Sequence, residues 1–284
     1  MVERKARAAA LIALALGTAG AHAREEPLWE AGLGLAGLYF PDYRGSDQSR
    51  GYVLPFPYLV YRGDMVKADR EGLRGTFFRS DAVDLDLSVG ASLPVSSSRN
   101  HAREAMPDLK PSIEAGPSLE VNLWSLSGHR AKLDLRLPVR AGVTLEANPR
   151  YIGLQAFPHL NLDVHDPAGF AGWNLGLLAG PIYADARHNR YFYEVEPAFA
   201  TPSRPAYQPG GGYAGAAFIG ALSKRFPRYW LGGFVRFDTL AGAVFEESPL
   251  VKARRYFAGG VGLSWILGES DARVPVNEYG ERPR

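Results

Sequence analysis

The chain of 284 residues carries 32 basic and 30 acidic side chains and contains no cysteine. A charge balance this close to neutral excludes nucleic acid as a partner, because neutralising phosphates requires an excess of basic residues. Without cysteine there are no disulfides, so backbone pairing and packing must supply the stability. Beyond residue 20 no stretch approaches 18 consecutive apolar residues, which excludes a transmembrane helix but leaves a transmembrane β-barrel open.

The first 23 residues have the pattern of a secretory signal peptide. Three basic residues within the first seven positions precede the apolar run Ala8–Gly17, and Ala21–Ala23 has the small-residue form of a cleavage site. We therefore predict that residues 1–23 are removed and that the mature chain begins at Arg24. A soluble amphipathic helix is the less favoured interpretation, because all three parts of a signal peptide are present in order.

Apolar and polar residues alternate along four long stretches of the mature chain, as in strands with one apolar face. Ordinary strands have about 5–6 residues, whereas a strand that crosses a membrane needs about 9–11. No amphipathic helix pattern follows to cover the apolar faces, and aromatic residues gather near the strand ends, as in the girdles of membrane barrels. We predict an all-β fold, a single antiparallel transmembrane β-barrel over residues 24–267, with a soluble β-sandwich as the alternative. The four stretches are Ala82–Pro94, Ser112–Trp124, Arg130–Ala141 and Tyr151–Val164.

The lengths of the connections predict about 12 strands. Bacterial barrels alternate long external loops with short periplasmic turns, and this alternation requires two short strands in Asp64–Phe78, broken near Glu71-Gly72. The last strand then lies at about Arg254–Leu267, and residues 268–284 form a polar periplasmic tail. The long connections, predicted to be external, are Pro41–Arg50, Ser96–Pro111, Asp185–Gly211 and Gly242–Ala253.

Six prolines fall within or near these strands, where a closed sheet has no place for a residue without an N–H group. We expect bulges there, or strands that end sooner than the alternation suggests. The prolines are Pro55, Pro57, Pro117, Pro138, Pro158 and Pro181.

The alternation also assigns the two faces of the strands. Leu87 and Leu135 are expected to face lipid, and Asp86 and Arg136 to face the lumen. Four basic residues share the polar face of one strand, and two glutamates lie on the polar face of the strand before it. If the glutamates neutralise the basic row, the lumen is a closed polar network; if they do not, an anion-preferring path is plausible. These candidate lumen-lining residues are Arg130, Lys132, Arg136, Arg140, Glu114 and Glu120.

No catalytic, cofactor-binding or metal-binding motif stands out, and we expect no enzymatic activity. The five histidines of the mature chain are scattered, without a pair spaced to bind a metal. His159 and Asp163 share one strand face, which allows a hydrolase in the barrel wall or a polar lumen lining, and the polar lining is favoured. The connection Asp185–Gly211 exceeds the usual limit of about 15 residues for an unstructured loop. It is either a plug in the lumen or a partly ordered external loop.

Several loop and turn segments resemble the MltA-interacting protein family (MipA/OmpV). The more specific ones are Leu54–Tyr58 and Met106–Leu109, and the resemblance spans the mature chain to about Leu267. One departure is Ala105, where such proteins usually have glycine before the methionine; another is the polar tail after the last strand. The family-motif loop residues are Gly45, Ser46, Arg103, Met106, Pro107, Asp108 and Leu109.

The resemblance implies an outer-membrane scaffold that binds a periplasmic lytic transglycosylase and a murein synthase, with outer-membrane lipid and lipopolysaccharide around the barrel. It carries no residue-level site for that role. A small, anion-preferring pore is the alternative that the basic row suggests. A barrel enzyme acting on lipid is the third hypothesis, for which the sequence offers no constellation of residues.

Overall fold

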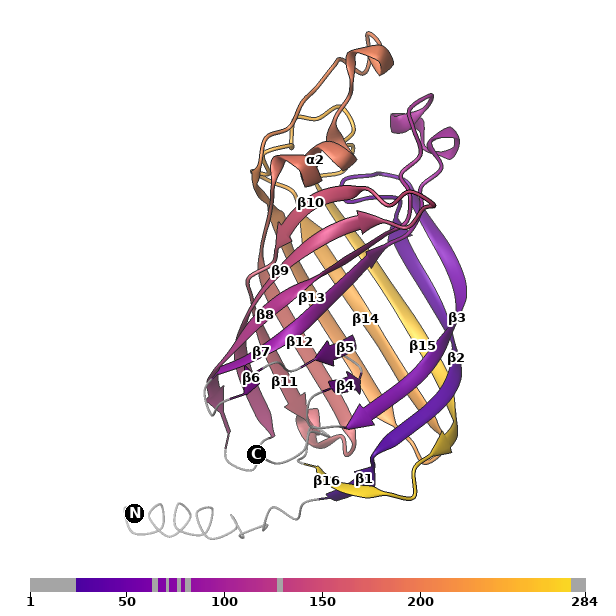
Figure 1. The fold of residues 1–284 in the computed structure, drawn as a ribbon, viewed down its shortest axis with the longest axis vertical. Helices are drawn as coiled ribbons and strands as arrows, with labels where there is room; N and C mark the ends of the chain where they lie inside the picture. The colour runs from indigo at the N-terminus through magenta and orange to yellow at the C-terminus, as the bar shows by residue number, and fades with distance from the viewer. Residues whose placement is uncertain are drawn as a thin grey trace, which may run out of the picture.

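The computed structural model describes residues 24–62, 66–69, 72–75, 78–79, 83–126 and 130–276. The predicted signal peptide, residues 1–23, and the end of the predicted tail, residues 277–284, lie outside the described residues. One antiparallel sheet curls round into a barrel (Figure 1). Loops cover one end of the barrel, and the described ends of the chain, Arg24 and Val276, lie at the other.

The strands follow one another round the barrel in chain order, and the last long strand pairs with the first. Two of the segments, β10 and β11, share the partners β9 and β12, so they form one interrupted strand. The antiparallel sheet of fourteen described segments confirms the predicted fold class. The number of about twelve strands stays a prediction, because residues 70–71, 76–77 and 80–82 lie outside the described residues. The segments are β2 (Trp29–Pro41), β3 (Ser49–Arg62), β4 (Val66–Asp69), β5 (Gly72–Gly75), β6 (Phe78–Arg79), β7 (Val83–Ser92), β8 (Ser112–Ser125), β9 (Ala131–Thr144), β10 (Tyr151–Ala156), β11 (His159–His165), β12 (Trp173–Ala184), β13 (Gly212–Arg225), β14 (Tyr229–Thr239) and β15 (Arg255–Glu269).

Two of the irregularities in the described sheet lie at prolines, whereas the register shifts at Asn122/Trp124, Tyr151/Gly153 and Ile266/Gly268 do not. Pro158 separates β10 from β11, and the register of β12 against β13 shifts just after Pro181. Pro55 and Pro57 stay within the ladder between β3 and β2. Among the described residues β4 pairs with β3 only at Tyr61 and Arg62. Both prolines therefore lie where the described sheet gives β3 a neighbour on one side only, the position in which a missing N–H group costs least.

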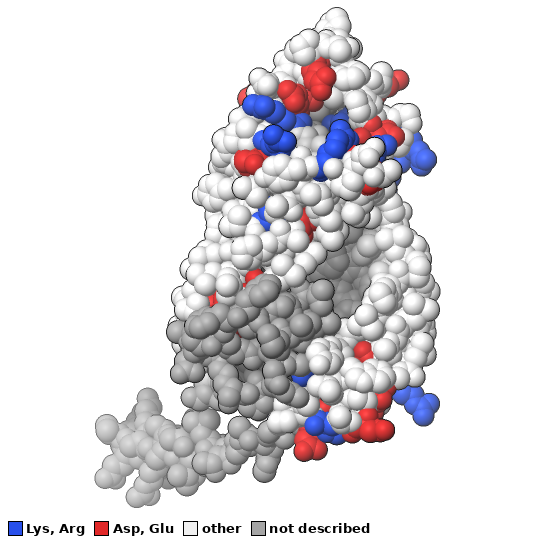
Figure 2. All heavy atoms as spheres, viewed as in Figure 1, with Lys and Arg blue, Asp and Glu red and all other residues white. Residues whose placement is uncertain are grey.

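The two faces of the wall differ in polarity, as the alternation predicted. Charged side chains gather at the two ends of the molecule and leave an almost uncharged band between them on the face seen in Figure 2. A band of exposed apolar side chains is what a lipid-facing barrel surface requires. The inner face carries buried polar residues, among them Asp86, Glu120, Asp134 and Asp238. Exposed members of the apolar face include Leu33, Leu35, Val53, Leu59, Leu119, Val139, Leu160, Phe218, Val235, Phe257, Val261 and Trp265.

The two ends of the described chain, Arg24 and Val276, meet beneath the barrel. A two-stranded sheet joins β1 (Arg24–Pro27) to β16 (Arg273–Val276). The last wall strand runs to Glu269, so the segment predicted as a polar tail from residue 268 begins within β15 and continues into β16. No helix in the described part of the chain has the length and apolar character needed to cross a membrane.

Candidate functional site

The basic row of β9 lies against buried carboxylates. Lys132 Nζ is 2.8 Å from Glu120 Oε1 and 3.1 Å from Asp134 Oδ2. Arg136 lies 3.4 Å from Glu120 and 3.7 Å from Asp163. Glu120 is 7% exposed and Asp134 is fully buried, so these ion pairs are held inside the barrel. The middle of the predicted row is thus neutralised by carboxylates from β8, β9 and β11.

The ends of the predicted row behave differently. Arg130 precedes β9 and its side chain is exposed, so it lies outside this buried network. Arg140 donates two hydrogen bonds to Ser88 Oγ on β7, at 2.9 and 2.7 Å. Glu114 faces His188 of the long loop, with 3.3 Å between Glu114 Oε1 and His188 Nε2. One of the two glutamates expected to oppose the row therefore reaches the loop helix instead.

A further cluster of ion pairs lies near the end of the barrel that holds the described chain ends, Arg24 and Val276. Glu30 of β2 is 1% exposed and accepts hydrogen bonds from the Tyr58 hydroxyl and from Arg62 of β3, each at 3.2 Å. Its carboxylate is also 3.3 Å from Arg225 of β13. Since β13 is separated from β2 by β14 and β15, the Arg225 side chain reaches a strand that is not its neighbour in the wall.

The connections at the opposite end pack into one body, here called the cap, made of residues 42–48, 93–111, 145–150, 185–211 and 240–254. Its apolar core includes Tyr43, Val195, Leu240, Phe245 and Leu250, which are all at most 5% exposed. Burial raises the pKa of the Tyr43 and Tyr193 phenols, so both stay neutral donors. The Tyr43 hydroxyl donates to Leu250 O (2.7 Å) and the Tyr193 hydroxyl to Arg44 O (2.9 Å).

The family-motif loop residues hold the cap together. Arg103 donates to Phe192 O (3.0 Å) and Pro107 O (3.2 Å), and its guanidinium lies over the Tyr43 ring. Asp108 accepts from the backbone N–H of Ser97, and Met106 and Leu109 are buried. Gly45, at φ +93°, accepts two backbone hydrogen bonds from residues 252 and 253, and Ser46 accepts one from Asn100. These motif positions therefore have a structural role in this chain.

The long loop forms a helix, α2 (Ala186–Tyr193), which packs against β10 at the barrel mouth (Figure 1). The Asp185 side chain caps it by accepting from the His188 N–H at 2.7 Å. Gly153 of β10, at φ +115°, makes this approach possible, because a Cβ there would lie 2.3 Å from Asp185 Oδ1. The helical part of the loop thus lies at the mouth of the barrel, and a plug in the lumen stays a prediction.

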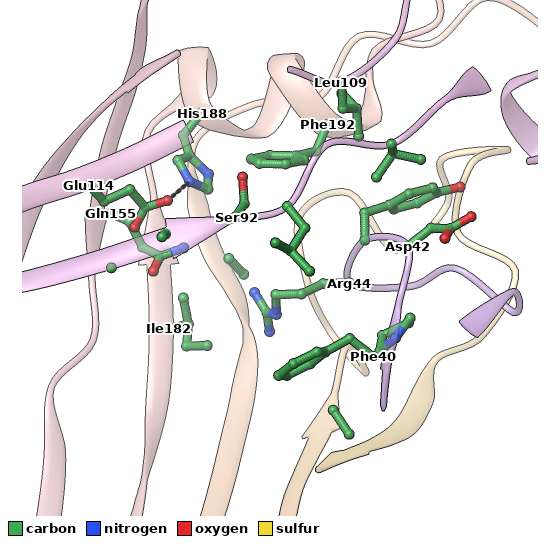
Figure 3. A pocket seen from close by; sticks show the side chains of 18 of the residues that line it. Phe40, Asp42, Arg44, Ser92, Leu109, Glu114, Gln155, Ile182, His188 and Phe192 are labelled. Carbon is green, nitrogen blue, oxygen red and sulfur yellow. Dashed lines mark hydrogen bonds and ion pairs between the residues drawn. The ribbon is translucent and has the colours of Figure 1, made fainter. Parts of the chain in front are cut away.

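A cavity of about 330 Å³ lies beneath the cap. Figure 3 shows His188, Glu114 and Gln155 on one side of it and Phe40, Asp42 and Arg44 on another. Phe192 and Phe245 supply apolar wall. Its basic lining residues are Arg44, Arg140 and Arg236.

Two of these arginines share one carboxylate. Asp238, fully buried, binds Arg44 Nε at 3.0 Å and also Arg236 of its own strand. Sequence reasoning missed Arg44, Arg236, Asp238 and His188 as cavity residues. The alternation of Arg236 and Asp238 on one face of β14 was a signal for two of them, whereas Arg44 and His188 come from loops whose path the alternation does not define.

Catalytic geometry is not evident at the one pair considered for it. His159 Nδ1 lies 2.6 Å from Phe157 O, while the Asp163 carboxylate accepts from Asn161 at 2.7 Å. Within the described residues no group of three or more His, Asp or Glu side chains is placed to hold a metal ion.

Comparison with known proteins identifies the family. The model of the family described as MltA-interacting protein MipA matches residues 33–267. No curated protein matches the chain. Among solved structures, outer membrane phospholipase A from Escherichia coli aligns over 85% of this chain and 91% of its own, with 12% identity and a TM-score of 0.36. An active-site mutant of the same enzyme gives the same values. Because the family match covers most of the sequence, the chain belongs to the MipA family.

Proposed function

We propose that this barrel spans the outer membrane, with the cap outside, and acts as an anchor for periplasmic murein-remodelling enzymes, namely a lytic transglycosylase and a murein synthase. Its role is binding, without catalysis. The observation that carries the proposal is the state of the lumen: the basic row meets Glu120 and Asp134, and the Glu30 cluster joins β2 to β13 near the terminal end. Charged groups that bind each other in this way favour a rigid platform over a water-filled path. The family description supports an interaction with a transglycosylase of the MltA type.

The periplasmic surface available to a partner is larger than short turns alone would give. A specific interface needs about 800 Å² from each partner, which turns of a few residues supply poorly. The β1–β16 sheet adds a surface with exposed side chains at Asp271 and Arg273, at the same end of the barrel as the turns at 166–172 and 226–228. We place the partner contact on this surface.

Site-specific crosslinking in intact envelopes tests this placement. A photo-crosslinking amino acid at Asp271 or Arg273 is expected to capture a lytic transglycosylase, identified by mass spectrometry. The same group at Arg190, exposed on α2 in the cap, is the matched control and is expected to capture none. Capture from Arg190 alone, or from neither side, contradicts the anchor proposal.

The second candidate is an anion-preferring pore, which the basic cavity residues beneath the cap favour. Planar-bilayer recording separates it from the anchor. We expect the full barrel to be electrically silent, because α2 covers the mouth and the ion pairs occupy the lumen. A steady anion-selective conductance that falls on Arg136→Ala would put the pore ahead.

A further inference from the structure

The cavity beneath the cap has the chemistry of a ligand site, and this is independent of whether the barrel anchors a partner. We infer that the cavity binds a small organic carboxylate that has an apolar body and a hydrogen-bond donor next to its carboxylate. Its volume, about 330 Å³, lies at the small end of the usual range for ligand pockets, about 300–1,000 Å³. The lining is mostly apolar, with a few converging polar groups, as such pockets require.

The arginines that line the cavity outnumber the carboxylates available to neutralise them. Arg44, Arg140 and Arg236 face two carboxylates, those of Asp238 and Glu114. The third carboxylate of the lining, Asp42, is bound elsewhere: its partners are Arg50, at 2.6 Å, and Asn100, at 2.8 Å. Three guanidinium groups against two carboxylates leave one positive charge, which an anionic ligand would balance.

The accessible surface of these arginines also points to a ligand. Asp238 is fully buried, yet the Arg44 and Arg236 side chains that bind it remain 21% and 28% exposed. Both side chains line the cavity, and the buried Arg44 Nη2 has no hydrogen-bond partner among the described residues, so a molecule inside the cavity could bind it. Guanidinium groups bind carboxylates with two parallel hydrogen bonds, which makes a carboxylate the fitting anion.

Two buried acceptors on α2 account for the hydrogen-bond donor of the ligand. His188 is 6% exposed and Asn189 is fully buried, and both line the cavity. In the tautomer that donates from Nε2 to Glu114, His188 Nδ1 is an acceptor, and neither Nδ1 nor Asn189 Oδ1 has a hydrogen-bond partner in the structure. A buried polar atom without a partner destabilises the fold, because it has lost its hydrogen bonds to water. A hydroxyl or amide N–H on the ligand would satisfy one of them, while Phe40, Phe192 and Phe245 pack against its apolar body.

Isothermal titration calorimetry of the full barrel in detergent micelles tests the site with three matched probes. Mandelate carries the carboxylate, the ring and a hydroxyl; mandelamide lacks the charge, and phenylacetate lacks the hydroxyl. We expect mandelate to bind at least tenfold more tightly than mandelamide and severalfold more tightly than phenylacetate. Equal binding of mandelate and mandelamide overturns the anion site, and equal binding of mandelate and phenylacetate overturns the donor requirement.

Variants separate the cavity from the rest of the protein. Arg236→Gln is expected to weaken mandelate at least tenfold, and Arg150→Gln, an exposed arginine of the cap, to leave it unchanged. Should Arg236→Gln fail to show the heat-modifiable gel shift of a folded barrel, Arg140→Gln replaces it, since Arg140 bonds only to the Ser88 hydroxyl among the hydrogen bonds described. Ala258→Leu, which fills the cavity without changing its charge, should abolish binding. Wild-type affinity in the folded arginine and leucine variants refutes the proposal.

Discussion

The cap differs from the terminal half of the barrel, the half nearer to the described chain ends Arg24 and Val276, in how its charged groups are matched. In the terminal half, Lys132 and Arg136 are surrounded by carboxylates at contact distance, and the Glu30 cluster repeats the arrangement at the base. Under the cap, the arginines outnumber the carboxylates, and a cavity separates them from the opposite wall. A row of like charges on a strand therefore does not by itself define a pore, because the neighbouring strands decide whether each charge is matched.

The two regions also differ in what holds them together. The terminal half depends on the ladder of backbone hydrogen bonds between strands, which a barrel satisfies without loops. The cap has little sheet of its own and is held by an apolar core and by side-chain bonds to backbone carbonyls, such as Arg103 to Phe192 O and Ser248 to Tyr193 O. Its sequence requirements are therefore specific, which explains why the family-motif residues gather there.

The largest expected contrast is in accessibility. With the cap outside, cysteines at Ser98 and Ser203 should react with an impermeant maleimide on intact cells, because both side chains are exposed. A cysteine at Asp271, exposed at the terminal end, should react only after the outer membrane is permeabilised. Ser97 is unsuitable as a label position, since its side chain is 2% exposed and bonds to Pro107 O. The reverse pattern of labelling would invert the orientation.

Removing a charge from the buried network of Glu120, Lys132 and Arg136 should lower the free energy of unfolding far more than removing one from the cap surface. Glu120→Gln removes one of the two carboxylates that Lys132 and Arg136 share in the lumen and leaves them Asp134. Breaking a buried pair completely typically costs about 3–5 kcal/mol, so the loss here should lie at or below the lower end of that range. The expected result is a lower free energy of unfolding in a reversible folding assay. Glu146→Gln is the control: its pair with Arg150 has the same 2.8 Å distance but lies in the exposed β9–β10 turn, so the change should not be resolved. Equal effects would mean that the Glu120 pairs are not shielded from water.

Strand alternation was enough to predict the wall but not the cap. Period two defines both the faces and the length of β7, β8 and β9, and the alternation of connection lengths correctly required two short segments, now β4 and β5. It also placed Glu120 beside the basic row, since cross-strand neighbours follow from a hairpin. The contact of Glu114 with His188 could not be predicted, because it joins residues 74 positions apart through a loop that has no periodic pattern.

A charged side chain on the outer face of the terminal half should lower the free energy of unfolding more than the same side chain on the cap. Leu135→Arg places a guanidinium on the face predicted to meet lipid, which near the midplane costs about 2–4 kcal/mol. Leu145→Arg makes the same exchange just beyond the end of β9, where the leucine is 56% exposed in the cap. We expect the first variant to lower the free energy of unfolding in lipid vesicles and the second to change it little. A comparable loss for both variants would contradict the assignment of Leu135 to lipid.

The smallest expected effect lies within the cap and has the opposite sign. Ala105 has φ +62°, in the left-handed region that costs a residue with a Cβ about 1–2 kcal/mol. Glycine, the usual residue at this position in the resembling family, removes that strain but loses more entropy on folding, so Ala105→Gly should stabilise the protein by about 0.5 kcal/mol. Glu104→Gly is the matched control, because this exposed neighbour has φ −50° and gains no relief. The two variants should therefore shift the thermal midpoint in opposite directions, Ala105→Gly upward and Glu104→Gly downward. A downward shift in both variants would show that Ala105 is not strained in this turn. The cap would then accept a left-handed alanine because the surrounding backbone adjusts to it, and not because the hydrogen bonds of the cap outweigh the strain.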